Sequence, residues 1–146
     1  MRSLFLSAVL AVLTLTQFGC GGDASTYEGP KRVAIKGKVT LDGEPVLAGS
    51  ISIIPSDGAS EKARKSGGAI TNGEFDIPEA QGPNVGKHNV EIRWQKPTGK
   101  QTKDNDTGEL VDVLAEAVPE KYNTSTELTM EVVEGAEPFS FDLKTE

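Results

Sequence analysis

The side chains that could do chemistry are few and scattered along this 146-residue chain. It holds one histidine, His88, and one cysteine, Cys20. A catalytic or metal site that needs two imidazoles is therefore excluded. His88 alternates along the chain with Val90, Ile92 and Trp94, so we expect its ring to be partly buried at one end of a strand. This pattern favours a structural histidine over a general base.

A run of acidic residues, Asp104 to Glu109 followed by Asp112, superficially resembles a calcium-binding loop. An EF-hand register that starts at Asp104 places Glu109 where the invariant Gly belongs and Ala115 where the bidentate Glu belongs. We therefore expect a solvated acidic loop rather than a metal site.

Nucleophiles and stacking side chains give no stronger signal. The serines of the predicted loops are Ser56, Ser60 and Ser66. None of them stands in a Gly-x-Ser-x-Gly motif, the turn that presents a nucleophilic serine. Tyr27, Tyr122 and Trp94 are too scattered to predict a sugar-stacking platform, and we expect Trp94 to lie in the core. The sequence thus predicts no catalytic residue, no cofactor, no metal ligand and no enzymatic activity.

The charge of the chain narrows the range of partners. Its formal net charge is −7, with lysines dispersed among the acidic residues. Nucleic-acid binders need a basic patch, so no nucleic-acid partner is expected. An acidic surface also gives no electrostatic help in docking on anionic lipid.

The N-terminus carries the most informative pattern, an apolar run from Leu4 to Leu15 that is too short to span a bilayer comfortably. It follows Arg2 and closes on Gly19 and Cys20. This arrangement resembles a bacterial lipoprotein signal, which implies a signal peptide over residues 1–19 and lipidation of Cys20. Gln17 departs from the Leu usual three residues before the cysteine. An ordinary cleaved signal peptide and an uncleaved anchor remain alternatives.

Lipidation would have consequences for the rest of the protein. The mature chain would have 127 residues, a net charge of −8 and no cysteine left for a disulfide. Residues 20–32 are small and polar, the composition of a flexible tether. The resemblance implies a cell-envelope protein attached to a bacterial membrane through its N-terminal lipid. Gly21, where an Asp would signal retention in the inner membrane, favours the outer membrane.

Beyond the tether, hydrophobic residues alternate with polar ones at the period of β-strands. Asp42-Gly43 and Asn72-Gly73 are turn dipeptides. Together they predict an all-β domain over residues 33–146, a seven-stranded antiparallel β-sandwich. The predicted strands are 33–41, 46–54, 69–71, 74–77, 88–94, 128–132 and 139–143.

Strand parity also predicts which side chains face inward. The residues expected to be buried are Val39, Ile53, Phe75, Val90, Ile92, Trp94, Met130 and Phe141. The residues expected to face water are Lys38, Glu91, Arg93 and Asp142.

The segment 97–127 is the one long connection, and loops of this length are usually functional or disordered. Its first half, Pro97 to Gly108, is polar and predicted to be mobile. Its second half, Glu109 to Val118, has apolar spacings that suit one short amphipathic helix ended by Pro119. We expect Leu114 and Tyr122 to pack that half against the sandwich.

Several motifs resemble those of carboxypeptidase-regulatory-like domains, which are small transthyretin-like (prealbumin-like) sandwiches related in architecture to Ig-like folds. The matching segments are Gly37 to Val46, with its Asp-Gly-x-Pro-Val turn, Ile70 to Phe75, with its Asn-Gly hairpin, and Gly86 to Val90. His88 stands where such domains usually have an aromatic residue. The resemblance covers about residues 33–143, and its motifs are turn and core residues that say little about function.

The sequence therefore favours a non-catalytic envelope lipoprotein whose sandwich binds an envelope protein or a polysaccharide, or serves a structural role. The alternative is an enzyme or an enzyme accessory with an unrecognised site in the 97–127 segment.

Overall fold

The computed structural model of the protein describes residues 29–56 and 62–146, and this part of the chain is built almost entirely of strands. Two short 3-10 helices, η1 (Glu79–Gln81) and η2 (Glu120–Tyr122), accompany them. The all-β prediction is confirmed. The strands are β1 (Ile35–Leu41), β2 (Glu44–Pro45), β3 (Ala48–Pro55), β4 (Ser66–Thr71), β5 (Glu74–Ile77), β6 (Gly86–Arg93), β7 (Gln95–Lys103), β8 (Leu110–Glu116), β9 (Thr129–Val132) and β10 (Phe139–Leu143).

The predicted signal peptide, Cys20 and most of the predicted tether lie outside the described residues. Among the residues that are described, no helix is long and apolar enough to cross a membrane.

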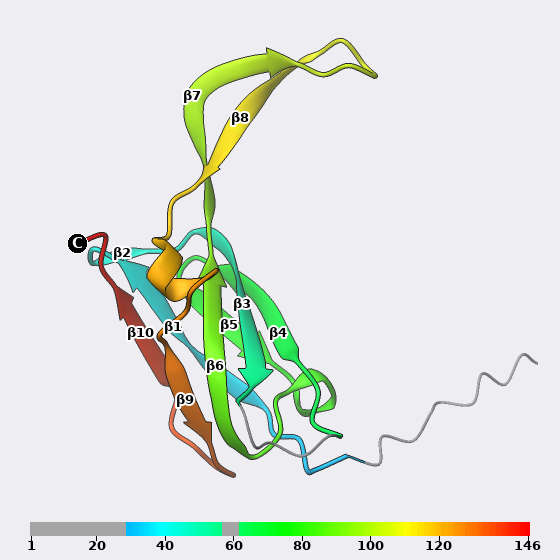
Figure 1. The fold of residues 1–146 in the computed structure, drawn as a ribbon, viewed down its shortest axis with the longest axis vertical. Coiled ribbons are helices and arrows are strands. Elements are labelled where there is room, and N and C mark those ends of the chain that lie inside the picture. Colours follow the sequence, from blue (N-terminus) through cyan, green and yellow to red (C-terminus); the bar gives the residue numbers. More distant parts are fainter. Residues whose placement is uncertain (1–28, 57–61) are drawn as a thin grey trace, which may run out of the picture.

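The body of the molecule is an eight-stranded sheet with the order β10-β1-β5-β4-β3-β6-β9, to which β2 adds by pairing with β1. Its two halves, β10-β1-β5 and β4-β3-β6-β9, meet through a single pair, Thr71 with Glu74. The body's pairings are antiparallel except that of β10 with β1, which is parallel. The remaining strands, β7 and β8, form a separate two-stranded sheet that projects from one end of the body (Figure 1).

The inward side chains of both halves form one hydrophobic core. All eight residues predicted to be buried are buried, from Val39 at 0% exposure to Phe141 at 9%. Lys38, Arg93 and Asp142 are exposed as predicted, whereas Glu91 is half-buried. Strand parity therefore predicted correctly which side of these strands faces the core.

The two predicted turn dipeptides adopt the backbone that their residues favour. Asp42 and Gly43 have φ values of 53° and 87°, and Asn72 and Gly73 have φ values of 51° and 79°. Two successive positive φ values match the twist of a tight hairpin, and Asn, Asp and Gly tolerate them best. These turns direct β1 into β2 and β4 into β5.

Three expectations about the strands need correction. All seven predicted strands are present, but the described chain adds β2, β7 and β8. The pairing is not antiparallel throughout, because β10 runs parallel to β1. The helix predicted over 109–118 is wrong, since Leu110–Glu116 is strand β8. Its apolar spacing fits both periods, and the β-branched Val111 and Val113 suit a strand better than a helix.

Replacing Phe141 by Ala should destabilise the domain by about 3–5 kcal/mol, since it leaves a cavity in a closely packed core. The Phe141 ring lies 6.3 Å from that of Phe75 and 6.5 Å from that of Phe139, centroid to centroid. Urea unfolding followed by Trp fluorescence measures the loss. Arg93→Ala, on the exposed side of β6, is the control and should cost under about 1 kcal/mol. Similar losses in the two variants would contradict this core.

Candidate binding arm

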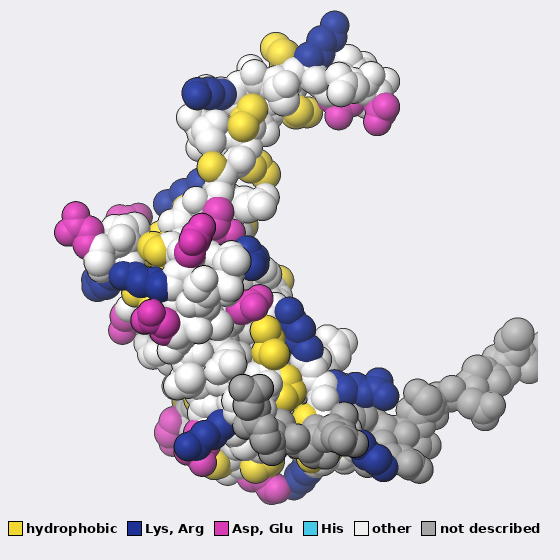
Figure 2. Space-filling view, viewed as in Figure 1, with side chains coloured by type: hydrophobic (Ala, Val, Ile, Leu, Met, Phe, Trp, Pro, Cys, Tyr) yellow, Lys and Arg dark blue, Asp and Glu magenta, His cyan; other side chains and the backbone are white. Residues whose placement is uncertain are grey.

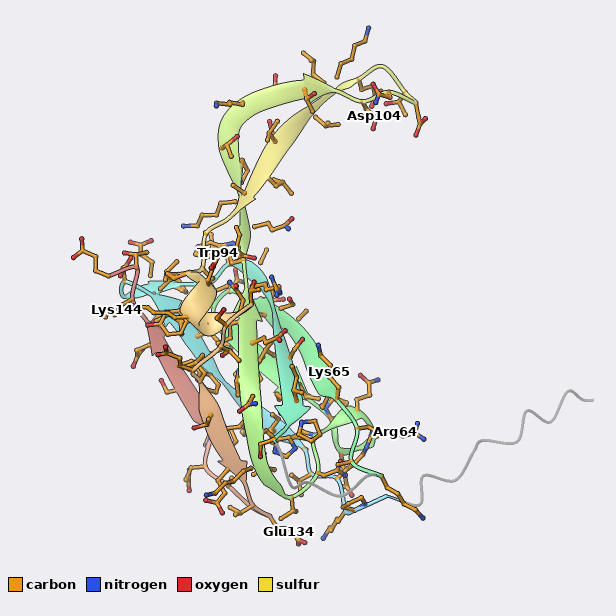
Figure 3. All side chains as sticks on the ribbon, viewed as in Figure 1. Arg64, Lys65, Trp94, Asp104, Glu134 and Lys144 are labelled. Carbon is orange, nitrogen blue, oxygen red and sulfur yellow. The ribbon has the colours of Figure 1, made fainter. Side chains whose placement is uncertain are left out.

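The arm, residues 95–116, consists of β7 and β8 and the turn between them. Only Trp94 separates the end of β6 from the start of β7, so the arm continues directly from a core strand. Six residue pairs join β7 to β8, from Gln95 with Glu116 at the base to Lys103 with Leu110 near the tip. Figure 3 shows Trp94 at the base of the arm and Asp104 at its tip.

The tip explains the acidic run noted in the sequence. The Asp104 carboxylate accepts hydrogen bonds from the backbone N–H groups of Asp106 (3.0 Å) and Thr107 (2.8 Å) and from the Thr107 hydroxyl (3.0 Å). These bonds, those from Thr107 first, hold the pKa of Asp104 below its ordinary value. Gly108 supplies a φ of 73° for the return of the chain. Asp104 therefore orders a turn.

An irregularity in the pairing lies midway along the arm. Between the pairs Pro97–Leu114 and Gln101–Asp112, the three residues Thr98, Gly99 and Lys100 of β7 lie opposite the single residue Val113 of β8. The Thr98 hydroxyl donates to the carbonyl of Val113 at 2.9 Å. Such an insertion bends the bulged strand and increases its twist. The bend of the arm in Figure 1 lies in this part of the ribbon.

The base of the arm is held by one carboxylate. Glu116 Oε1 accepts hydrogen bonds from the backbone N–H of Trp94 (2.8 Å) and of Val118 (3.2 Å). The Lys96 ammonium lies 3.7 Å from the centroid of the Trp94 indole, a cation–π contact. Trp94 and Val118 are themselves buried, at 6% and 3% exposure. The base thus belongs to the body, which fixes where the arm leaves it.

Beyond its base the arm is exposed on both faces. Every residue of β7 is exposed, and in β8 only Val113 is partly buried. Leu110, Val111 and Leu114 keep 68%, 41% and 52% of their surface exposed. The expectation that Leu114 would pack on the body is therefore wrong. Figure 2 shows yellow hydrophobic side chains along the arm, interspersed with charged ones. Large aliphatic side chains exposed on a projecting ribbon mark a candidate interaction surface.

Tyr122 and Trp94, by contrast, lie as the sequence predicted. Tyr122, in η2, packs against the core, and its hydroxyl accepts a hydrogen bond from the backbone N–H of Lys144 at 3.2 Å. Trp94 is a core residue. Both side chains are structural, and neither lies on the exposed apolar surface of the arm.

His88 is more deeply buried than expected, with 2% of its surface exposed. Its Nδ1 lies 3.0 Å from the carbonyl oxygen of Gly86, so the tautomer that carries the proton on Nδ1 fits this contact. Its Nε2 is buried and has no hydrogen-bond partner among the described residues. Burial lowers the pKa of His88, and the Gly86 contact opposes this in part. A ring with so little exposed surface is suited to packing rather than to exchanging protons with a substrate.

The other sequence candidates do not converge. Ser56 donates to the Lys87 carbonyl and Ser66 to the Gln81 carbonyl, while Ser60 lies outside the described residues. No group of three or more His, Cys, Asp or Glu in the described chain is placed to hold a metal ion. The structure therefore brings none of these candidates together in a catalytic arrangement.

Surface hollows lie on the body, away from the arm. One of about 500 Å³ lies over β1, β4 and β5, and it is bordered by both signs of charge, including Lys36, Lys38, Glu74 and Asp76. A hollow of about 260 Å³ adjoins it beside Phe139, and one of about 330 Å³ lies beside His88 and Met130. None of the three is lined by a residue of the 97–127 segment.

Comparisons with known proteins add no relatives. No family model matches the chain, and no curated protein matches it. Among solved structures, a 9R-lipoxygenase from Cyanothece PCC8801 aligns with a TM-score of 0.33 and 12% identity, over 78% of this chain and 16% of that chain. A likeness at this level carries no argument about the function of the chain.

Replacing His88 by Phe should reduce the pH dependence of stability. Because burial lowers the pKa of His88 below 6.5 in the folded state, the unfolded state binds the proton first as the pH falls. The stability from neutral His88 is present above about pH 6.5 and is lost as the pH falls through the folded-state pKa.

Thermal melts from about pH 8 to about pH 5 measure this difference. The wild type should lose more of its melting temperature towards low pH than His88→Phe does. Lys87→Gln, a neighbouring change that leaves the imidazole in place, should follow the wild type. If the melting temperatures of the wild type and His88→Phe fall in parallel with pH, the pKa of His88 is not lowered in the folded state.

Proposed function

We propose that this protein is an exported lipoprotein, attached to a bacterial membrane through Cys20, whose non-catalytic domain binds a protein partner in the cell envelope with its arm. The observation that carries the proposal is the exposure of Leu110, Val111 and Leu114 on a ribbon that projects from a complete core. Exposing such side chains costs solubility and adds nothing to the packing of the body, which favours a role in recognition.

The body fits the proposal as a prealbumin-like sandwich of the carboxypeptidase-regulatory-like type. Its two half-sheets share one core and are linked through the Asn72-Gly73 hairpin. The Asp42-Gly43 turn stands at the matching place after β1. Domains of this kind serve as accessory or binding modules, and specificity resides in what the scaffold presents.

The position of the arm is consistent with attachment at the N-terminus. The first described residues contact the end of the body opposite the arm: Val33 N–H donates to the Pro83 carbonyl at 3.0 Å, and Lys31 pairs with Glu134 at 2.7 Å. Figure 1 shows the arm leaving from the other end. A lipid at Cys20 would therefore leave the arm free to reach partners, and we favour the outer membrane as its location.

The chemistry of the arm favours a protein over a polysaccharide. Residues 95–116 include no aromatic side chain on which a sugar ring could stack. They offer aliphatic side chains, mixed charges and two strand edges, which suit contact with another protein. The acidic net charge of the chain does not suit nucleic acid.

Replacing Cys20 by Ser should abolish lipid attachment and release the domain from membranes. Fractionation of cells and the mass of the mature protein measure the two effects. Ser25→Ala, a change in the same segment that leaves the thiol in place, is the control and should remain membrane-bound. If Cys20→Ser stays with the membrane and keeps its N-terminal segment, the apolar run is an uncleaved anchor.

Shortening the arm should remove binding and leave the fold intact. Joining Pro97 to Leu114 through Asn-Gly in place of residues 98–113 keeps the base and closes it with a favourable hairpin turn. The melting temperature should stay within a few degrees of the wild type, since the replaced residues lie outside the core. In photo-crosslinking experiments in the envelope, the variant should no longer give the cross-linked products of the wild type. If the variant unfolds, the arm is required for the fold and the proposal that it serves binding alone is wrong.

A further inference from the structure

The arm presents its most exposed aliphatic side chains on one face, here called the leucine face. Directly opposed residues of an antiparallel pair point to the same side, and successive residues alternate. The pairs Pro97–Leu114, Gln101–Asp112 and Lys103–Leu110 therefore share one face. It holds Leu110 and Leu114, at 68% and 52% exposure, whereas the other face holds the less exposed Val111 and Val113.

The two strands of the arm carry opposite charge. β7 contains three lysines, Lys96, Lys100 and Lys103, and no acidic residue, whereas β8 contains Asp112 and Glu116 and no basic one. Of these, Lys103 and Asp112 lie on the leucine face, whereas Lys96 lies on the opposite face and the Glu116 carboxylate is bound at the base. A partner surface of a single sign would attract one strand and repel the other. A surface that attracts both strands presents acidic residues to β7 and lysines to β8. A second copy of the arm does so when its β8 lies over β7 and its β7 lies over β8.

We propose that the partner of the arm is a second copy of this chain, with the two leucine faces stacked around a two-fold axis that runs along the arms. This rests on the proposed function, in which the arm is the binding element. In this arrangement β7 of each copy lies over β8 of the other. Pro97 meets Leu114 of the second copy, and Gln101 meets its Asp112. Lys103 meets its Leu110, and Asp112 of that copy lies two residues further along β8.

The other two-fold arrangements of a ribbon set each strand against its own counterpart, so that Lys103 does not meet Asp112. An axis across the arms stacks β7 on β7 and β8 on β8. Pairing at an edge joins β8 to β8 or β7 to β7 under any two-fold axis. The axis along the arms sets Lys103 of one copy near Asp112 of the other.

The same axis suits two chains held in one membrane. It points both arms the same way, so the first described residues of both chains lie on the same side of the pair. The face of a seven-residue strand is only about 24 Å long, which gives a small contact and weak association in dilute solution. Tethering on one membrane raises the effective concentration of the copies and favours the pair.

Cross-linking of the full, membrane-attached chain tests the proposal. Gln101→Cys places a thiol on the leucine face, and Thr102→Cys, one residue further along, places it on the opposite face. A short bis-maleimide should join Gln101→Cys chains into a dimer of twice the chain mass, several-fold more than Thr102→Cys chains. Labelling with a monofunctional maleimide controls for equal access to the two thiols.

Charge reversal tests the pairing of β7 with β8. In the Gln101→Cys background, Lys103→Glu alone and Asp112→Lys alone should each lower the dimer yield several-fold. When the two variants are expressed together, the mixed pair again has opposite charges at both of its contacts between positions 103 and 112, so the yield should return. Restoration can arise only between copies, because each chain carries one charge reversal.

The remaining outcomes overturn the proposal in distinguishable ways. A product of Gln101→Cys with a mass other than twice the chain identifies a different protein partner, which refutes the second copy and leaves the proposed function standing. Equal dimer yields from both faces, or no restoration in the mixed pair, refute the stacked arrangement. No product from either accessible thiol refutes both the second copy and the arm as a binding element.

Discussion

The pairing of β6 with β3 is the interaction on which the rest of the molecule depends. Six residue pairs join the two strands, from Ser50 with Arg93 to Pro55 with His88. Ile51, Ile53, Val90 and Ile92 are each at most 1% exposed, so this pair supplies the centre of the core. A slip of one residue would turn these side chains to the surface and their polar neighbours inward. The register is therefore strongly determined by burial.

The same strand determines where the arm begins. β6 ends just before the buried Trp94, and β7 starts at the residue after it. Glu116 binds the backbone N–H groups of Trp94 and Val118, so the returning strand is held at the point where the outgoing strand leaves. Because the core fixes Trp94, it also fixes the direction of the arm, and a flexible loop at this place would not present its side chains in a defined arrangement.

Much of the body could be predicted from the sequence, and the reason is physical. Alternation in β1, β5, β6 and β10 reports burial on one side, and Asp-Gly and Asn-Gly report the backbone of tight turns. The parallel pairing of β10 with β1 could not be predicted, because parity indicates which side of a strand is buried and not which strand lies beside it.

The arm escaped prediction because a pattern of apolar residues is normally interpreted as a buried face. Leu110, Val113, Leu114 and Ala117 have helical spacing, but only Ala117 packs against the core. Sequence periodicity does not reveal that the two leucines are exposed, because the same pattern arises whether or not the chain itself buries them.

Hydrogen exchange of the arm amides at increasing protein concentration tests the central claim most directly. If the arm is an exposed ribbon that stacks on a second copy, the amides of 110–114 should exchange quickly in dilute solution and become protected as the concentration rises. Those of β3 and β6 should be protected at every concentration. Protection of 110–114 equal to that of β3 and β6 in dilute solution, or no change at high concentration, would contradict the account.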